Sequence, residues 1–226
     1  MPDMVRRDMA APFPAVALAI EDLACRRGGR PVFTHVSANL AGGALLALTG
    51  RNGSGKTTLL RALALLTPHQ AGTIKWQGRD VAEAPEAWRG RLAWLGHVDG
   101  LKGDLTLAEN LVAAERLRGA GTPSAPRLDA ALAAFDLAPL AARPARTLSA
   151  GQRRRAALAR VVLSNAPLWL LDEPTNALDG PAQAALRAAL RRHLDAGGIV
   201  VAATHAPLDI AGAQTLELGS LERGMA

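Results

Sequence analysis

The chain has no tyrosine and a single cysteine, Cys25, among its 226 residues. One cysteine cannot form an internal disulfide, so a disulfide-stapled scaffold is excluded and a reducing compartment is favoured. No apolar run approaches the roughly 18 to 20 residues that cross a bilayer. The longest candidates are residues 40–49 and 168–171. We therefore expect a chain that does not span a membrane.

The N-terminal residues 1–20 make a poor secretory signal. Arg6 and Arg7 precede a short apolar patch, but Pro12 and Pro14 interrupt it. A secretory signal needs an unbroken apolar segment after its basic start. Together with the lone cysteine, this pattern predicts a protein of the cytosol.

Lysine is also scarce, being found only at Lys56, Lys75 and Lys102, so most of the basic charge is arginine. Lysine and arginine together number 26 against 20 acidic residues, which gives a net charge of +6 and a pI near 10.8. A basic surplus favours an anionic partner. Composition alone leaves three open: nucleic acid, an anionic membrane surface and a small anionic ligand.

Four short apolar runs alternate along the chain with amphipathic helical segments. They lie at residues 44–49, 92–95, 168–171 and 199–203. Each run is continuously apolar, as is typical of parallel strands that are covered on both faces. The pattern predicts an α/β fold built on a parallel sheet.

Two further regions complete the predicted organisation. Residues 22–40 and 72–81 alternate between apolar and polar residues around glycine-containing turns, which predicts a small antiparallel β layer. Residues 106–165 carry leucines at helical spacing, which predicts an inserted helical subdomain. We expect one domain over residues 1–226, with the sheet core and β layer at about 15–96 and 166–220 and the helical subdomain at about 97–165.

A glycine-rich motif follows the first of these apolar runs. Residues 50–57 match the pattern G-x-x-x-x-G-K-[ST] between a predicted strand and a predicted helix. In this motif backbone N–H groups surround a phosphate, Lys56 reaches the β- and γ-phosphate oxygens, and Thr57 ligates Mg²⁺. The alternative is a glycine-rich turn with an exposed lysine. The predicted ATP-binding residues here are Gly50, Arg51, Asn52, Gly53, Ser54, Gly55, Lys56, Thr57 and Thr58.

Two acidic residues end the apolar run at 168–171. Asp172 falls at the carboxyl end of that predicted strand, where ligands collect in a parallel sheet. Its carboxylate could hold Mg²⁺, and Glu173 beside it could orient and deprotonate an attacking water. An acidic pair that only caps the strand is the alternative, and the phosphate-binding motif favours the catalytic interpretation.

Residues 148–152 read Leu-Ser-Ala-Gly-Gln and open a predicted helix. Ser149 and Gln152 form a capping-box pattern, which by itself indicates only a well-capped helix. The segment resembles the LSGGQ signature of ABC-type ATPases, with Ala150 in place of the middle glycine. The motifs of this family follow one another along the chain in the family's order. After the signature and the acidic pair, the segment ending at Asp179 resembles the D-loop, and His205 occupies the place of the switch histidine.

This resemblance implies a P-loop NTPase fold of ABC type and a head-to-tail dimer. Two copies would close so that Ser149, Ala150, Gly151 and Gln152 of one subunit approach the γ-phosphate that Lys56 of the other holds. The isolated subunit should then hydrolyse ATP poorly. A lone histidine is more often a satisfied surface or core residue, but the ordered motifs imply that His205 contacts the γ-phosphate and fixes the geometry of Glu173. Asp179 would contribute to the closed nucleotide site.

Two positions depart from the family pattern. His97 stands where the family usually has a glutamine that senses Mg²⁺, and a histidine nitrogen could take that role. Arg27 stands near the place of the aromatic residue that stacks on adenine; its guanidinium plane could stack on the base, or it could be a solvated loop residue.

Residues 94–102, 105–111 and 166–174 are similar to the ATP-binding subunits of cytochrome c maturation systems. That resemblance implies a peripheral protein on the cytoplasmic face of a bacterial inner membrane. It would work as two copies with separate integral membrane subunits, in haem export or the release of a haem-loaded carrier. The five histidines show no ligand spacing, so we expect no direct haem binding by this chain.

Two alternatives share the catalytic motifs: the ATPase of another ABC importer or exporter, and an SMC-type nucleic-acid ATPase. The second requires a very long coiled coil between the phosphate loop and the signature, and the interval between Thr57 and Ser149 is too short for one. We therefore expect no nucleic-acid partner. The remaining basic surplus, including Arg153, Arg154 and Arg155, is interpreted as surface composition.

Overall fold

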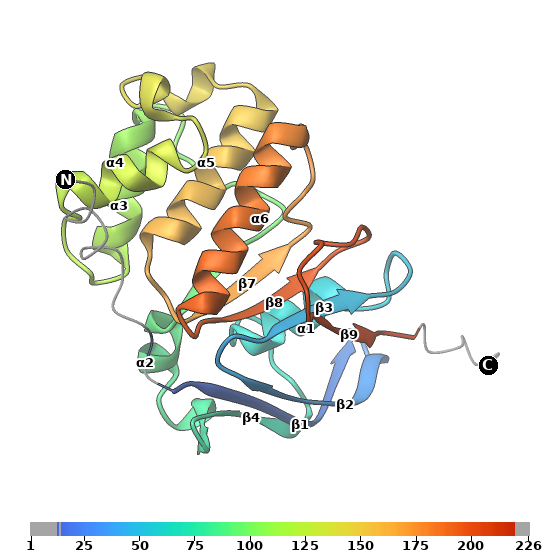
Figure 1. The fold of residues 1–226 in the computed structure, drawn as a ribbon. Coiled ribbons are helices and arrows are strands. Elements are labelled where there is room, and N and C mark those ends of the chain that lie inside the picture. The colour runs from blue at the N-terminus through green and yellow to red at the C-terminus, as the bar shows by residue number, and fades with distance from the viewer. Residues whose placement is uncertain (1–12, 14, 220–226) are drawn as a thin grey trace.

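A five-stranded parallel sheet forms the centre of the computed structural model, which describes residue 13 and residues 15–219 (Figure 1). The strand order is β6–β7–β8–β3–β9. The strands are β3 (Leu45–Thr49), β6 (Leu92–Leu95), β7 (Leu168–Asp172), β8 (Ile199–Ala203) and β9 (Gln214–Glu217). The first four confirm the predicted strands, whereas β9 was missed because it is a mostly exposed and polar edge strand. Arg6, Arg7, Pro12 and Pro14, on which the leader expectation depends, lie outside the described residues.

A second, four-stranded antiparallel sheet lies at the bottom of the view in Figure 1 and confirms the predicted β layer. Its order is β2–β1–β4–β5, with β1 (Ala17–Arg27), β2 (Arg30–Ala41), β4 (Ala71–Trp76) and β5 (Arg79–Asp80). In β1, Leu18 pairs with Leu40 on one side and with Trp76 on the other. Because these three side chains are buried, this sheet turns one apolar face toward the parallel sheet.

The helices occupy two levels in Figure 1. Helix α1 (Lys56–Leu63) lies between the sheets, and α2 (Pro85–Gly90) lies at one end. Helices α3 (Leu107–Leu117), α4 (Ala125–Ala133) and α5 (Ala150–Leu163) form the predicted helical region, and α6 (Gly180–Asp195) lies in front of the parallel sheet. Short 3₁₀ turns occupy Val81–Glu83, Ala138–Leu140 and Ala145–Thr147.

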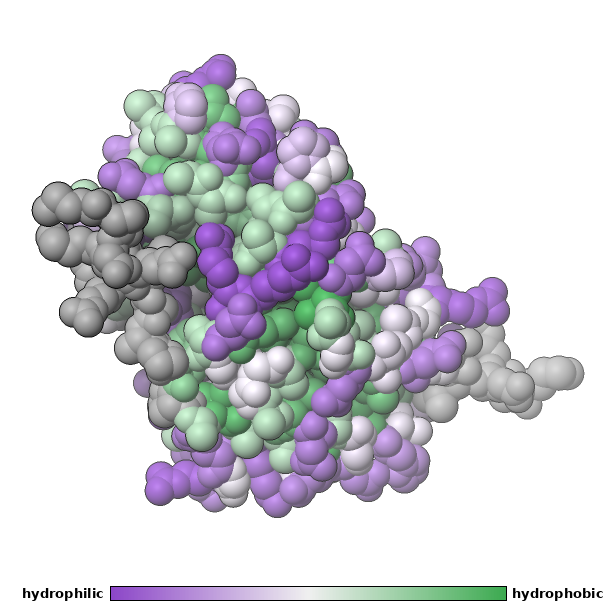
Figure 2. All heavy atoms as spheres, viewed as in Figure 1, coloured by the Kyte–Doolittle hydropathy of each residue, from purple (hydrophilic) through white to green (hydrophobic). Residues whose placement is uncertain are grey.

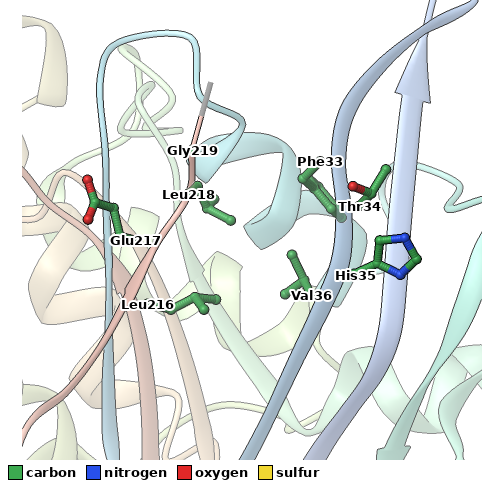
Figure 3. Close-up of a pocket in the computed structure, with 8 residues that line it drawn as sticks. All are labelled: Phe33, Thr34, His35, Val36, Leu216, Glu217, Leu218 and Gly219. Carbon is green, nitrogen blue, oxygen red and sulfur yellow. The ribbon is translucent and has the colours of Figure 1, made fainter. Parts of the chain in front are cut away.

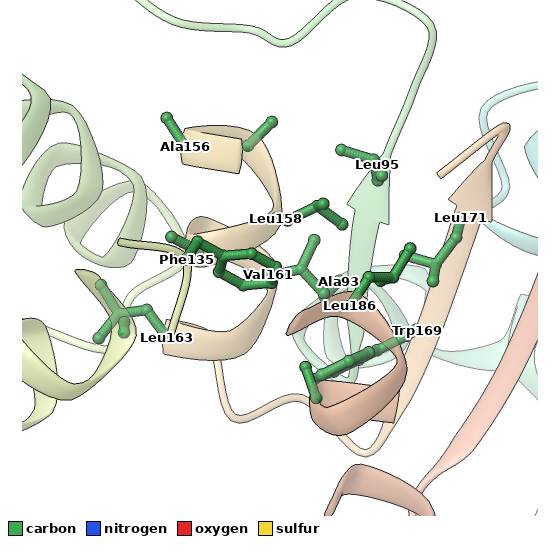
Figure 4. Packing of buried hydrophobic residues seen from close by; sticks show 14 of the residues in the cluster. Ala93, Leu95, Phe135, Ala156, Leu158, Val161, Leu163, Trp169, Leu171 and Leu186 are labelled. Atoms are coloured by element: carbon green, nitrogen blue, oxygen red, sulfur yellow. The ribbon is translucent and has the colours of Figure 1, made fainter. Parts of the chain in front are cut away.

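The two faces of the parallel sheet belong to two apolar clusters. On β7, Leu168 and Leu170 pack toward α1 and the antiparallel sheet, whereas Trp169 and Leu171 pack toward α5 and α6. Figure 4 shows the second cluster, in which Phe135 from the helical region lies beside Val161 of α5. Burial on both faces explains why the strand sequences are continuously apolar.

Helix α6 covers the parallel sheet with one apolar stripe. Leu186, Leu190 and Leu194 are buried, while Arg191 and Arg192 are exposed, so the helix has a core-facing apolar stripe with a solvated basic flank. Hydrophilic side chains gather along the exposed side of this helix (Figure 2). Within the described part of the chain, we find no helix that is both long and apolar enough to cross a membrane.

His193 on α6 is a buried titratable group that packs against β7 of the parallel sheet. Its ring stacks on Trp169, with ring centroids 4.0 Å apart and an interplanar angle of 14°. Burial lowers the pKa of His193 from 6.5 to about 4, although hydrogen bonds to the backbone of Ile199 and Pro167 oppose the shift. The folded protein therefore holds this imidazole in its neutral form near neutral pH.

Stability should consequently fall with acidification. As the pH drops below about 6.5, His193 is protonated in the unfolded chain before it is protonated in the folded protein. The free energy of unfolding that the neutral ring contributes is therefore complete above about pH 6.5 and is lost toward pH 4. The slope from this group is at most about 1.4 kcal/mol per pH unit. Urea unfolding at pH 7 and pH 5 should show this slope in the parent and in His35→Gln, whose histidine is exposed, but a smaller slope in His193→Phe. An unchanged slope in His193→Phe would contradict the assignment.

Candidate active site

The glycine-rich loop lies between β3 and α1 and closes around Lys56. The ammonium of Lys56 donates to the carbonyls of Gly50 at 2.8 Å and Arg51 at 3.2 Å, and the residue is only 7% exposed. Gly50 has φ +129°, and a Cβ there would lie 2.4 Å from the Leu218 carbonyl oxygen. Gly55 has φ +102°, and a Cβ there would lie 2.8 Å from the Val32 side chain. Glycine is therefore required at both ends of the loop.

The same loop carries unpartnered polar groups that suit an anion. No side chain caps the start of α1, so its first N–H groups remain available. Ser54 is 2% exposed, and its Oγ has no hydrogen-bond partner among the described residues. A buried hydroxyl without a partner is costly unless a ligand supplies one. The loop thus fits a phosphate group.

Thr57 and Asp172 meet although they are far apart in sequence. The Thr57 hydroxyl donates to the Asp172 carboxylate, and its Oγ1 lies 3.0 Å from both carboxylate oxygens. The two residues come together because α1 follows β3 and Asp172 ends β7, two strands away in the same sheet. A hydroxyl and a carboxylate are hard oxygen ligands that fit Mg²⁺, which takes few protein ligands and fills its shell with phosphate and water. The described residues contain no cluster of three or more histidine, cysteine, aspartate or glutamate side chains that could hold a metal ion.

Glu173 and His205 form a second pair at the same edge of the sheet. His205 Nε2 lies 3.3 Å from Glu173 Oε1, and the Glu173 side chain is 18% exposed. Glu173 adopts a left-handed backbone conformation, with φ +47°, and its N–H donates to the Ala203 carbonyl at the end of β8. Left-handed conformations of non-glycine residues cluster at functional sites. The pair joins a carboxylate that can accept a proton to an imidazole that can donate one.

Arg154 is a site residue that the sequence interpretation missed. We expected Arg153, Arg154 and Arg155 to belong to the surface, but Arg154 is only 4% exposed, so that expectation was wrong for this residue. Its guanidinium donates to the Asp172 carbonyl at 2.7 Å and to the Glu173 carbonyl at 2.6 Å. The periodicity of α5 could have found it, because Arg154 shares one helical face with the buried Ala157, Leu158 and Val161.

The signature segment starts α5 with the predicted capping box. Ser149 Oγ accepts a hydrogen bond from the Gln152 N–H at 3.2 Å, and the Ser149 N–H donates to Gln152 Oε1 at 2.9 Å. Ser149 and Ala150 are exposed, while a Cβ on Gly151 would lie 3.1 Å from the Ala177 carbonyl oxygen. The signature therefore packs against the turn that precedes α6. Over the ranges that the structure describes, no hydrogen bond joins it to the phosphate loop.

Three predicted site residues lie apart from these pairs. Arg27 is exposed at the end of β1, where it pairs with Arg30 across the β1–β2 turn. His97 is exposed in the loop after β6, and within the described chain no hydrogen bond connects it to Thr57 or Asp172. Asp179 caps α6 by accepting a hydrogen bond from the Ala182 N–H at 2.9 Å.

A pocket of about 250 Å³ adjoins the site between β2 and the end of β9. Figure 3 shows Phe33, Val36, Leu216 and Leu218 pointing toward one another across it, while Glu217 points away. Its lining is a mixture of polar and apolar groups and includes none of residues 50–57. The pocket therefore lies beside the phosphate loop without being part of it.

Comparison with known proteins places this geometry in a family. A family model described as ABC transporter matches residues 33–176. The chain is 50% identical over 205 residues to the cytochrome c biogenesis ATP-binding export protein CcmA of Rhodospirillum rubrum, covering 91% of this chain and 86% of that protein. It is 47% identical over 202 residues to the protein of the same name from Paracoccus denitrificans, covering 89% of each.

Solved structures show the same fold. The structure of an ATP binding subunit of an ABC transporter superposes with a TM-score of 0.75 at 27% identity, covering 83% of this chain and 79% of that one. A bacterial Atm1-family ABC exporter with ATP bound superposes with a TM-score of 0.80 at 23% identity. That match covers 92% of this chain and 38% of the exporter.

Proposed function

The chain belongs to the ABC transporter family of ATP-binding proteins, and from this premise we propose that it is the ATP-hydrolysing subunit of a membrane complex in cytochrome c biogenesis. The observation that carries the proposal is the convergence of Lys56, Thr57, Asp172, Glu173 and His205 at the carboxyl edge of one sheet. Relatives that are 42% to 50% identical over most of the chain carry the name of a cytochrome c biogenesis export protein. The complex would couple ATP-driven closure to haem export or to release of a haem-loaded carrier.

The site residues divide the work of hydrolysis. The N–H groups of residues 50–58 and the Lys56 ammonium bind and orient the triphosphate. Thr57 and Asp172 would hold Mg²⁺, which neutralises phosphate charge when bound. Glu173 accepts the proton of the attacking water, and His205, held 3.3 Å from it, orients that carboxylate and contacts the γ-phosphate. Arg27 would stack on adenine, and His97 would replace the glutamine near the metal.

A second copy of the chain would complete the site. Ser149 and Ala150 are exposed, although the signature belongs to the nucleotide chemistry of the family. We propose a head-to-tail dimer in which Ser149, Ala150, Gly151 and Gln152 of one copy, together with Asp179, face the nucleotide bound by the other. Closure would exclude water and supply donors to the γ-phosphate.

Removing the cap hydroxyl of the signature should separate stability from catalysis. Ser149→Ala and Thr106→Ala each remove one capping box, on α5 and α3, and each should cost about 1 kcal/mol of unfolding free energy. Only Ser149→Ala should also lower ATP hydrolysis by the dimer, because only this hydroxyl would face a nucleotide. Thermal unfolding and steady-state hydrolysis of both variants provide the measurement. Equal activities at equal stability would argue against the signature role.

The chain would attach to the cytoplasmic face of the inner membrane by binding separate integral membrane subunits. The loop after β6 exposes Val98, whose relative exposure is 79%, beside His97. The same loop is connected to the nucleotide site, because Arg154 donates both to the Gly96 carbonyl and to the carbonyls of Asp172 and Glu173. We place the contact with the membrane subunits in residues 97–110.

Affinity purification of the full chain from native bacterial membranes tests the assignment. We expect integral membrane proteins and a haem-handling protein to co-purify, and the purified chain to bind neither haem nor duplex DNA. A sugar or amino-acid permease as the sole partner would instead indicate another ABC transporter. Duplex binding that weakens steeply with salt would indicate a nucleic-acid ATPase.

A further inference from the structure

We propose that Arg154 is a positioning residue that holds Glu173 in its reactive conformation and ties it to the loop that carries His97. The inference rests on the proposed role of Glu173 as the residue that activates water. Arg154 lies on α5, two residues after Gln152 of the signature, and its side chain reaches two other segments of the fold. It touches none of the reacting atoms, so its effect must pass through the backbone that it binds.

The guanidinium bridges two segments with its two terminal nitrogens. Nη2 donates to the Asp172 and Glu173 carbonyls at 2.7 and 2.6 Å. Nη1 donates to the Gly96 carbonyl at 2.8 Å and lies 3.4 Å from Asp99 Oδ1. The planar fork of arginine can serve two segments at once, whereas a lysine ammonium is a single point donor. The bridge therefore depends on arginine and not only on positive charge.

The burial of Arg154 also indicates a positioning role. A cation in a core is costly unless its charge and its N–H groups are satisfied. The single acidic group within ion-pair distance in the described residues is Asp99, at 3.4 Å, and Nε has no partner there. An apolar side chain would pack on this face of α5 at lower cost, as Ala157 and Leu158 do. What the arginine adds is the set of contacts to three backbone carbonyls.

Two of those carbonyls belong to the strained end of β7. Glu173 has φ +47°, a left-handed conformation that ordinary side chains rarely adopt. Its N–H donates to the Ala203 carbonyl, and its own carbonyl accepts from Arg154 Nη2 and, at 3.2 Å, from the Asn176 N–H of the following turn. If the Arg154 contact is lost, only the Asn176 N–H of the adjoining turn still holds this carbonyl, so the Glu173 backbone can relax and its carboxylate can leave His205. Strain of this kind persists only where neighbouring groups enforce it.

The other end of the bridge is a loop that α5 and α3 hold firmly. Arg160, which lies further along α5, donates to the Gly100 carbonyl at 3.1 Å. Asn110 on α3 is buried, and it accepts from the Lys102 N–H at 2.7 Å and donates to the Lys102 carbonyl at 3.0 Å. A displacement of this loop would therefore move Arg154, and with it the backbone of Glu173. The bridge gives the loop a direct mechanical connection to the catalytic carboxylate.

The test uses Arg154→Lys in the full chain, with Arg155→Lys as its matched control. Arg155 is the next residue of the same helix, and it donates to the Phe135 carbonyl in the helical region at 3.0 Å. Under conditions where the chain dimerises with ATP, Arg154→Lys should lower kcat by about 10- to 100-fold, the cost of displacing a catalytic group by about 1 Å. KM and the binding of a non-hydrolysable ATP analogue should change less than about threefold, because the phosphate loop is untouched. Arg155→Lys should change neither.

Non-additivity separates positioning from a general loss of structure. In single-turnover assays, Arg154→Lys should slow the Glu173→Gln protein by less than about twofold, because the group that it positions is already absent. A full further loss in that background would overturn the Arg154 proposal while leaving the proposed function intact. Parent-rate hydrolysis by Glu173→Gln alone would instead overturn the role of Glu173. Arg154→Gln replaces Arg154→Lys if the lysine variant does not fold, and failure of both to fold would make Arg154 a stability residue and overturn the proposal.

Discussion

Glu173→Gln should lower the rate of ATP hydrolysis by about 10²- to 10⁴-fold, the usual contribution of a general base, while ATP remains bound. The substitution keeps the size of the side chain but replaces the carboxylate with an amide that cannot accept the proton of water. The backbone contacts of Glu173 involve its N–H and its carbonyl, so the left-handed conformation should persist. With hydrolysis blocked, the closed dimer should accumulate with ATP, and size-exclusion chromatography with excess Mg-ATP should detect it.

Glu83→Gln is the matched control for this experiment. Glu83 is exposed in the 3₁₀ turn Val81–Glu83, away from the carboxyl edge of the parallel sheet. Its substitution also replaces a carboxylate with an amide. Its hydrolysis rate and its ATP-dependent dimerisation should equal those of the parent. Hydrolysis by Glu173→Gln at the parent rate would remove Glu173 from the proposed mechanism. His205 would then lose the carboxylate that it is proposed to orient.

The sequence predicted the parts of the fold in which burial and pattern agree. Strands β7 and β8 are buried at every residue, so their sequences are continuously apolar and could be recognised. The capping box at Ser149 was also predictable from the sequence, because the pairing of Ser149 with Gln152 is local. The edge strand β9 was not, because three of its four residues are exposed and its pairing with β3 is a tertiary contact.

Arg154 shows what pattern reading misses within a site. In a run of three arginines, charge suggested solvent for all of them, yet Arg153 and Arg155 are partly exposed and Arg154 is buried. The reason is long-range: its partners are carbonyls at Gly96, Asp172 and Glu173, which lie in other segments of the chain. Backbone carbonyls exist at every residue, so no sequence motif marks them as partners. Only the helical phase of α5 distinguishes Arg154 from its neighbours.

Lys56→Met should weaken ATP binding by roughly 10²- to 10³-fold, the equivalent of about 3 to 4 kcal/mol, since each hydrogen bond to a charged group is worth about 1.5 to 3 kcal/mol. Methionine keeps an unbranched stem in the space that Lys56 fills but removes the ammonium. The phosphate then loses its charged donor, and the Gly50 and Arg51 carbonyls lose the donor that closes the loop around them. Both losses act on nucleotide binding, so the binding defect should exceed that of any other substitution proposed for this site.

Lys75→Met supplies the matched control, because Lys75 is one of only two other lysines and lies on β4 of the antiparallel sheet. There its ammonium lies 2.7 Å from Glu21 Oε2, a partly exposed ion pair whose loss should cost little stability. Calorimetric titration with a non-hydrolysable ATP analogue should show parent affinity for Lys75→Met and strongly reduced affinity for Lys56→Met. Equal affinities in the two variants would mean that the phosphate does not sit in the loop of residues 50–57. Because each variant removes one positive charge, a general effect of net charge on binding an anion would weaken both alike, and only a bound phosphate in that loop separates them.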